Sequence, residues 1–166
     1  MLGAIIGDIA GSSYEVSEIN SLRKKEINYS NRIKILDRNI SLFNGESSYT
    51  DDTILTCAVA NSVMTDKDYY KNLKEFGLRE LSYGLDRYGS GFCDWLNGDY
   101  IGESYGNGCA MRISPIANYY DDLDKISYET KQATYPTHNN KEAYDMAILV
   151  SVAIYLAKLK ASKNYI

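Results

Sequence analysis

Apolar residues recur at intervals of three and four along most of this 166-residue chain, which is the spacing of one face of an α-helix. The clearest case lies in residues 140–160, where Ala143, Ala147 and Ile154 belong to such a face and indicate an amphipathic helix. Nowhere do apolar strands alternate with helices as they do in parallel sheets. We therefore predict one all-α domain that spans residues 1–166.

The same spacing predicts the other helices. They are expected at residues 50–64, 69–83, 91–96, 109–120 and 122–134, with Pro115 in the first turn of a shorter piece. Gly3, Gly7 and Gly11 form a stripe on a helix at the start of the chain, which would let another backbone approach closely. Residues 17–49 are polar and mixed, and we predict a long loop there, with short extended pieces at 33–36 and 40–43.

Composition excludes several classes of function. Eighteen Lys and Arg against 22 Asp and Glu give a net charge of −4, which argues against nucleic acid and anionic membranes as partners. No apolar run approaches the length of a membrane span. The three cysteines include no Cys-x-x-Cys pair, and we expect them to be reduced, as in a cytoplasmic protein.

Thr50, Asp51 and Asp52 form a cluster of oxygen donors at the start of a predicted helix. Hard cations such as Mg²⁺ prefer oxygen ligands and keep several waters. The alternative is an ordinary N-cap followed by first-turn acids, which the helix dipole favours. Taken alone, the cluster fits either interpretation.

Residues 104–112 contain two glycines around Asn107, just before a predicted helix. Such a turn exposes backbone N–H groups that can receive a phosphate, and it can equally be a tight turn that only starts a helix. Arg112 would add a cation near a bound anion, or it would be a structural ion-pair partner.

Two further motifs carry candidate side chains. His138, the one histidine of the chain, stands beside Thr137 and Asn139, either of which could cap the helix that follows. It could contact a ligand or be structural. Asp8 and Glu15 near the start of the chain would serve as acid or base groups if partly buried, or would simply lie near the end of a small-residue helix.

Taken in chain order, the four motifs at residues 3–15, 49–53, 104–112 and 136–138 resemble the ADP-ribosylglycohydrolase family. The resemblance implies a compact orthogonal helical bundle that hydrolyses the glycosidic bond between ADP-ribose and an acceptor such as arginine or serine. It also implies two Mg²⁺ or Mn²⁺ ions that bind the distal ribose and position or polarise water.

The resemblance assigns roles to individual residues. Thr50, Asp51 and Asp52 match metal ligands, and Glu15, Asp51 and Asp52 are the catalytic candidates. The substrate-binding positions that it implies are Ser104, Tyr105, Gly106, Asn107, Gly108, Met111 and His138.

The sequence departs from the family in one respect. The family completes its two-metal site with a second Asp-x-Asp-Thr-like motif near the C-terminus, whereas the last aspartate here is Asp145. We therefore expect a C-terminally truncated bundle, about the N-terminal two-thirds of the family domain, with an incomplete metal site. Apolar helix faces left uncovered would favour a homo-oligomer or a complementing C-terminal fragment.

Three functional hypotheses follow. The chain is a hydrolase that is active once its metal site is completed, with an ADP-ribose-containing small molecule or an ADP-ribosylated protein as its partner. Alternatively, it is a catalytically impaired binder that sequesters ADP-ribose-type nucleotide signals, for example in phage or viral counter-defence. The third hypothesis is a truncated interaction module.

Overall fold

The computed structural model describes residues 1–24, 42–84 and 88–164, and for residues 14–24 it describes the backbone alone. These residues form two compact units, one made of Leu2–Thr50 and the other of Asp51–Ile166 together with Met1. Each unit is described by itself. Among the described residues, no helix is both long enough and apolar enough to cross a membrane.

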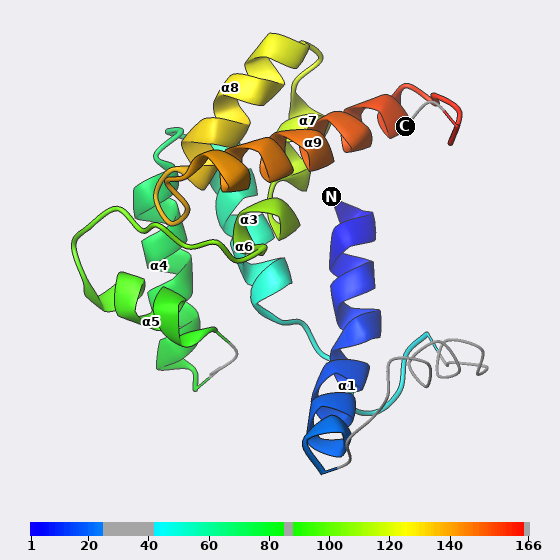
Figure 1. The fold of residues 1–166 in the computed structure, drawn as a ribbon, viewed down its shortest axis with the longest axis vertical. Helices are drawn as coiled ribbons and strands as arrows, with labels where there is room; N and C mark the ends of the chain where they lie inside the picture. Colours follow the sequence, from blue (N-terminus) through cyan, green and yellow to red (C-terminus); the bar gives the residue numbers. More distant parts are fainter. Residues whose placement is uncertain (25–41, 85–87, 165–166) are drawn as a thin grey trace. The chain divides into compact units, whose positions relative to one another are not determined.

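The larger unit consists of helices joined by turns and loops (Figure 1). In chain order these are α3 (Asp51–Met64), α4 (Tyr69–Ser82), α5 (Ser90–Asn97), α6 (Gly108–Met111), α7 (Ser114–Tyr119), α8 (Leu123–Thr134) and α9 (Lys141–Lys158). The described residues contain no strand beyond one isolated bridge, between Glu103 and His138. The all-α prediction is therefore confirmed.

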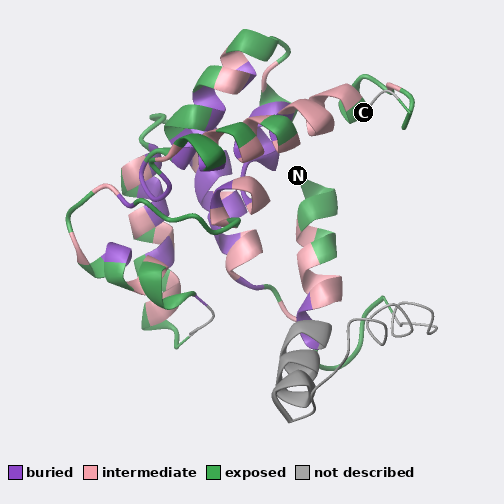
Figure 2. Cartoon of the chain, viewed as in Figure 1, coloured by how far each residue is buried: buried purple, intermediate pink, exposed green. Residues whose placement is uncertain are grey.

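Helix α3 is the centre of this unit, because it packs against α4 on one side and α7 on another. Figure 2 shows buried residues along most of its length. The core around it includes Leu55, Val59, Leu73 and Trp95, none more than 2% exposed. Burial of such side chains contributes about 1.5–3 kcal/mol each and is the main force that holds the helices together.

Polar caps fix where the helices begin. Asp68 and Asp122 accept hydrogen bonds from the backbone N–H groups of Lys71 and Lys125 and so start α4 and α8. At α9 the cap is Asn140, whose Oδ1 accepts from Ala143 N at 2.9 Å. The prediction of Asn139 or Thr137 as that cap was wrong, because the following carboxamide lies one residue nearer the helix.

The segment predicted as one helix over residues 109–120 is two short helices, α6 and α7. Pro115 stands in the first turn of α7, where its missing N–H breaks no intrahelical bond. The chain can therefore change direction between the two helices, and Arg112 lies at this break.

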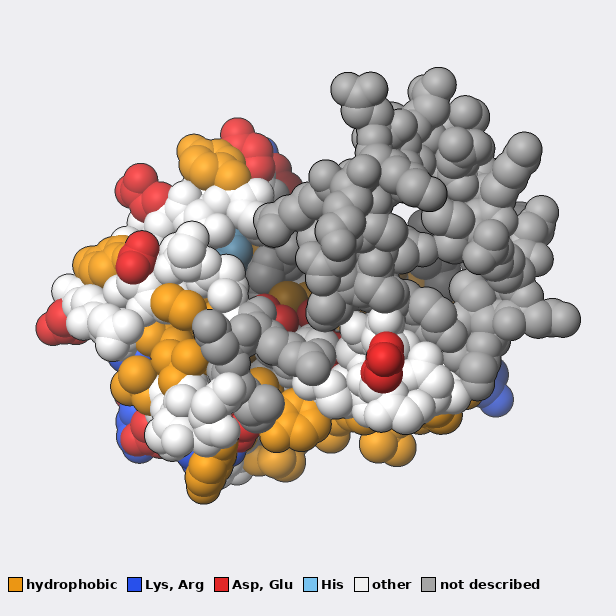
Figure 3. Space-filling model, turned by 90° about the horizontal axis from the view of Figure 1, so that it is seen from below, with side chains coloured by type: hydrophobic (Ala, Val, Ile, Leu, Met, Phe, Trp, Pro, Cys, Tyr) orange, Lys and Arg blue, Asp and Glu red, His pale blue; other side chains and the backbone are white. Residues whose placement is uncertain are grey.

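Helix α9 was predicted to be amphipathic, but it has apolar side chains on its outer face as well as on its buried face. Ala143, Ala147 and Ser151 are buried at four-residue intervals, and α9 packs on α8, α7 and α6. The opposite face is also apolar, because Leu149 is 71% exposed and Val152 is half-buried beside it. Figure 3 shows other exposed hydrophobic side chains, in orange, on the face seen from below.

In the smaller unit, α1 (Leu2–Lys24) continues well past the point where a loop was predicted to begin at residue 17. Its second half contains neither glycine nor proline, so nothing in the local sequence ends the helix earlier. The predicted piece at 33–36, and most of that at 40–43, lie outside the described residues. Within the described residues, no atom lies within 4 Å of where a Cβ would stand on Gly3, Gly7 or Gly11.

Candidate functional site

A cavity of about 430 Å³ opens in the larger unit, at one end of α3 and beside α5 and α6. Its floor holds buried side chains, among them Leu55, Trp95, Arg112 and His138. Its rim is exposed and polar and includes Glu103 and Asn107. The size and the mixture of apolar floor and polar rim are typical of small-molecule sites.

Two loops are bound together to form one wall of the cavity. Gly102 N donates to Pro136 O at 2.9 Å, Ser104 N donates to Thr137 O at 3.1 Å, and Asn139 N donates to Gly102 O at 2.8 Å. A Cβ on Gly102 would lie 2.6 Å from the carbonyl oxygen of Thr137. Only glycine therefore permits this close approach of the two backbones.

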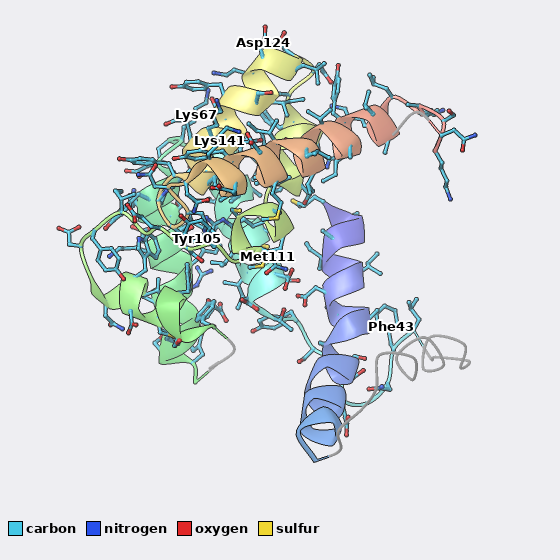
Figure 4. The ribbon with its side chains drawn as sticks, in the orientation of Figure 1. Phe43, Lys67, Tyr105, Met111, Asp124 and Lys141 are labelled. Atoms are coloured by element: carbon cyan, nitrogen blue, oxygen red, sulfur yellow. The ribbon has the colours of Figure 1, made fainter. Side chains whose placement is uncertain are left out.

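The cavity brings together most of the residues that the resemblance implied. The lining includes Asp51, Ser104, Gly106, Asn107, Gly108, Met111 and His138. Tyr105 is the exception, because its side chain is 77% exposed and does not line the cavity. Figure 4 labels Tyr105 on the loop before α6 and Met111 in α6 itself.

The expected metal ligands are only partly placed at the cavity. Asp51 lines it, whereas Asp52 does not. Thr50 is buried and belongs to the smaller unit, where its N–H and its hydroxyl donate to the two carboxylate oxygens of Asp8 at 2.9 and 2.5 Å. Within the described part of the chain, no group of three or more His, Cys, Asp or Glu side chains is arranged to hold a metal ion.

The donor set nevertheless suits a hard cation. A threonine hydroxyl that gives its one proton to Asp8 keeps oxygen lone pairs for a cation, and two carboxylates follow it in the chain. Such a set would hold one hydrated Mg²⁺ more readily than a fixed pair of ions. Glu15 lies in α1, and its side chain is outside what the structure describes.

Several cavity residues were not predicted from the sequence. Trp95 and Phe92 stack with ring centroids 5.3 Å apart and form an apolar wall, and Trp95 Nε1 donates to Tyr100 O at 3.0 Å. Their spacing in one short helix was a visible signal, because residues three apart share a helix face. Nothing local in the sequence indicated that this face lines the same cavity as the loop before α6.

Arg112 is fully buried in the cavity floor and has no ion-pair partner among the described residues. Its Nη2 donates to Ala133 O at 3.0 Å and to Thr137 Oγ1 at 2.7 Å, while Nε and Nη1 find no hydrogen-bond partner there. Burial lowers the pKa of Arg112 to about 10, so it remains charged at neutral pH. From the sequence alone, Arg112 could be either a cation that binds an anion or a structural ion-pair partner.

His138 is 5% exposed and lies beside this charge. Burial, and after it the positive charge of Arg112, lowers the pKa of His138 to about 4. The imidazole is therefore neutral at physiological pH. A buried arginine next to a neutral imidazole gives the floor a positive potential, which favours a ligand that carries negative charge.

Comparison with known proteins shows to which family the sequence belongs. The sequence model of the family described as ADP-ribosylglycohydrolase matches residues 1–165. The chain belongs to the ADP-ribosylglycohydrolase family. Two of the motifs on which the resemblance was based, at residues 104–112 and 136–138, and Asp51 of a third lie in the lining of the cavity.

Among curated proteins, the chain is similar to ADP-ribosylhydrolase ARH3 of several vertebrates. It is 27% identical to the Xenopus tropicalis protein over 177 residues, which are 95% of this chain and 49% of that protein. It is 26% identical to the Homo sapiens protein over 179 residues, which are 95% of this chain and 48% of that protein. The chain spans about half the length of these relatives, less than the two-thirds expected from the motifs.

Proposed function

We propose that this ADP-ribosylglycohydrolase family member binds ADP-ribose, or a small molecule or protein that carries it, in the cavity beside α5 and α6. The supporting observation is that one cavity collects the residues that the family resemblance implied for substrate binding, with the exception of Tyr105. Its volume of about 430 Å³ lies within the range of ligand sites in proteins.

The chemistry of the lining suits such a ligand. The stacked rings of Phe92 and Trp95 offer an apolar wall to a base or a sugar face. The turn of Gly106 and Gly108 leaves room for backbone N–H groups near a diphosphate. The buried charge of Arg112 favours the negative ligand over a neutral nucleoside.

We further propose that the chain hydrolyses the ADP-ribosyl glycosidic bond when its metal site is complete. Thr50, Asp51 and Asp52 would hold a Mg²⁺ or Mn²⁺ ion through oxygen atoms. When bound, the ion would polarise water and orient the ribose hydroxyls. Of these three residues, Asp51 is the one that lines the cavity where the substrate would lie.

The second candidate is a binder without turnover. One observation favours it: of the two adjacent aspartates, only Asp51 lines the cavity, and among the described residues Glu103 on the rim is the one other acidic residue there. A site of this kind would retain ADP-ribose-type nucleotides, such as signalling molecules, without cleaving them. An interaction module without ligand binding is the third possibility.

Calorimetric titration of ADP-ribose, with and without Mg²⁺, tests the proposal. We expect saturable binding near one ligand per chain. Replacement of Asp51 by Asn should abolish the effect of Mg²⁺ on that binding, because it removes the carboxylate nearest the ligand. Asp124→Asn is the matched control, since this exposed residue lies at the far end of α8 (Figure 4).

Release of ADP-ribose from ADP-ribosyl-arginine and ADP-ribosyl-serine separates the two candidates. Release that depends on Mg²⁺ and on Asp51 supports the hydrolase. Binding without release supports the binder. Absence of binding by calorimetry contradicts both and leaves the interaction module.

A further inference from the structure

Three buried side chains form a continuous hydrogen-bonded chain that ends at the cavity. Arg112 Nη2 donates to Thr137 Oγ1 at 2.7 Å, and Thr137 Oγ1 lies 2.6 Å from His138 Nδ1. Arg112, Thr137 and His138 are 0%, 4% and 5% exposed. Water therefore has little access to these groups, and the hydroxyl of Thr137 forms its hydrogen bonds with the other two side chains.

The protons in this chain can be assigned by counting. A guanidinium group only donates, so the oxygen of Thr137 accepts from Arg112. The hydroxyl has one proton of its own, and the one acceptor that the described residues offer it is His138 Nδ1. If Nδ1 carried the proton instead, the hydroxyl proton would be buried without an acceptor, at a cost of about 1–3 kcal/mol.

The other nitrogen of the ring then carries the imidazole proton, and it lies at the open side of the site. A Cβ on Gly108 would lie 3.4 Å from His138 Cε1 and 3.5 Å from Nε2. Gly108 is the first residue of α6 and lines the cavity. The absence of a side chain at position 108 leaves this edge of the ring facing cavity space.

We propose that Arg112 and Thr137 are positioning residues that hold His138 in its Nε2–H tautomer, as a fixed hydrogen-bond donor for an acceptor oxygen of the bound ligand. His138 is thus a donor and not a general base. The depressed pKa of the imidazole agrees with this assignment, because burial and the charge of Arg112 both oppose a second proton. The inference deepens the proposed function, since phosphate and ribose oxygens of ADP-ribose are acceptors.

The tautomer is directly measurable, because the chain has a single histidine. Long-range ¹H–¹⁵N correlation spectra of the ¹⁵N-labelled full chain without ligand show one imidazole and distinguish a protonated nitrogen from an unprotonated one. We expect Nε2 to be protonated and Nδ1 to be unprotonated between about pH 5 and pH 8. A protonated Nδ1, or averaging of the two nitrogens, overturns the proposal.

Two substitutions at Thr137 form a matched pair. Thr137→Val removes the hydroxyl and keeps the branched shape, and we expect a mixture of tautomers. Thr137→Ser keeps the hydroxyl, and we expect the wild-type pattern. A wild-type pattern in Thr137→Val also overturns the proposal, and the wild-type spectrum alone remains decisive if that variant does not fold.

The ligand is tested separately with ADP-ribose as the probe. We expect Thr137→Val to weaken ADP-ribose binding about tenfold, the loss of roughly one oriented hydrogen bond, and Thr137→Ser to stay within about twofold of wild type. If Thr137→Val and Thr137→Ser bind ADP-ribose with equal affinity, the proposed role of the His138 Nε2–H donor in binding is overturned. An Nε2–H tautomer in a chain that does not bind ADP-ribose supports the positioning of His138 and refutes the proposed ligand.

Discussion

Arg112 carries a positive charge into the floor of the cavity, where no described carboxylate neutralises it. A buried unpaired charge is costly to stability, so its retention points to a role in the site. Arg112 acts on two neighbouring residues. It donates a hydrogen bond to Thr137, and its charge helps to lower the pKa of His138. Both effects depend on contacts between segments about 25 residues apart in the chain.

The pKa of His138 makes folding stability depend on pH. The folded pKa of about 4 lies below the ordinary value of 6.5, so the unfolded state binds more protons between these values. Stability contributed by this residue is therefore present above pH 6.5 and is lost as pH falls toward 4. We expect a loss of roughly 3 kcal/mol at most, measured by urea unfolding at a series of pH values.

His138→Gln is the variant that isolates this effect, because it does not titrate. Besides Arg112, the charged residues that line the same cavity as His138 are Asp51 and Glu103, and both are present in the wild-type protein and in the variant. We expect the two stability curves to differ in slope between about pH 6.5 and pH 4 and nowhere above it. Parallel curves throughout would show that the imidazole is not buried beside the arginine.

At the level of single residues, the sequence identified candidate site residues but could not show where each one lies in the fold. Seven predicted site residues, six of them from the glycine, asparagine and histidine motifs, lie in the lining of the cavity, whereas Leu55, Trp95 and Gly102 there were not predicted. Tyr105 was misplaced, since a loop residue can face either solvent or a ligand and its exposure depends on the loop path. Arg112 and Thr137 were ambiguous because their roles come from distant partners.

Among the elements, the paired loops around Gly102 and Thr137 determine the shape of the cavity wall. Gly102→Ala would place a Cβ 2.6 Å from a backbone oxygen that cannot move independently. We expect this variant to lose about 1–3 kcal/mol of folding stability and to weaken ADP-ribose binding. Thermal unfolding and calorimetric titration are the measurements.

Gly91→Ala is the matched control for that prediction. Gly91 also lines the cavity, but nothing lies within 4 Å of the position of its Cβ, and it stands in helix α5. Alanine favours the helix over glycine by about 1 kcal/mol, so we expect unchanged or higher stability. Equal destabilisation in the two variants would show that the close loop approach does not shape the wall.

Helices were the features that the sequence predicted best. Segments α3, α4, α5, α8 and α9 each have a cap or a periodic apolar pattern, and each was found where expected. The end of α1 was missed, because its polar second half lacks an apolar pattern but also lacks a helix breaker. The outer face of α9 was missed, since a helix that is apolar on two sides still contains the spacing of an amphipathic one.

For the whole molecule, that outer face has a consequence for assembly. Leu149 and Val152 lie near the middle of an open apolar groove along α9. The sequence predicts that a second copy of the chain or a complementing C-terminal fragment covers such a face, and we propose that a second copy does so by pairing of two α9 helices about a two-fold axis. Such a self-complementary apolar contact is what a symmetric interface requires.

Sedimentation velocity tests this assembly. We expect the chain to sediment at twice its 18.7 kDa mass at micromolar concentrations, and Leu149→Glu to return it to the mass of one chain. Leu78→Glu, at an exposed position on α4, is the control and should sediment as wild type does. A single-chain mass for the wild-type protein at all concentrations contradicts the dimer.

The central claim is that ADP-ribose binds beside His138, and the single imidazole of the chain tests it most directly. The measurement is a titration of ADP-ribose into ¹⁵N-labelled protein, followed by the imidazole signals of His138, with adenosine as the comparison ligand. We expect a saturable shift of the Nε2–H signal with ADP-ribose and a much weaker response to adenosine, which lacks the diphosphate. Imidazole signals that stay unchanged at saturating ADP-ribose would contradict the account.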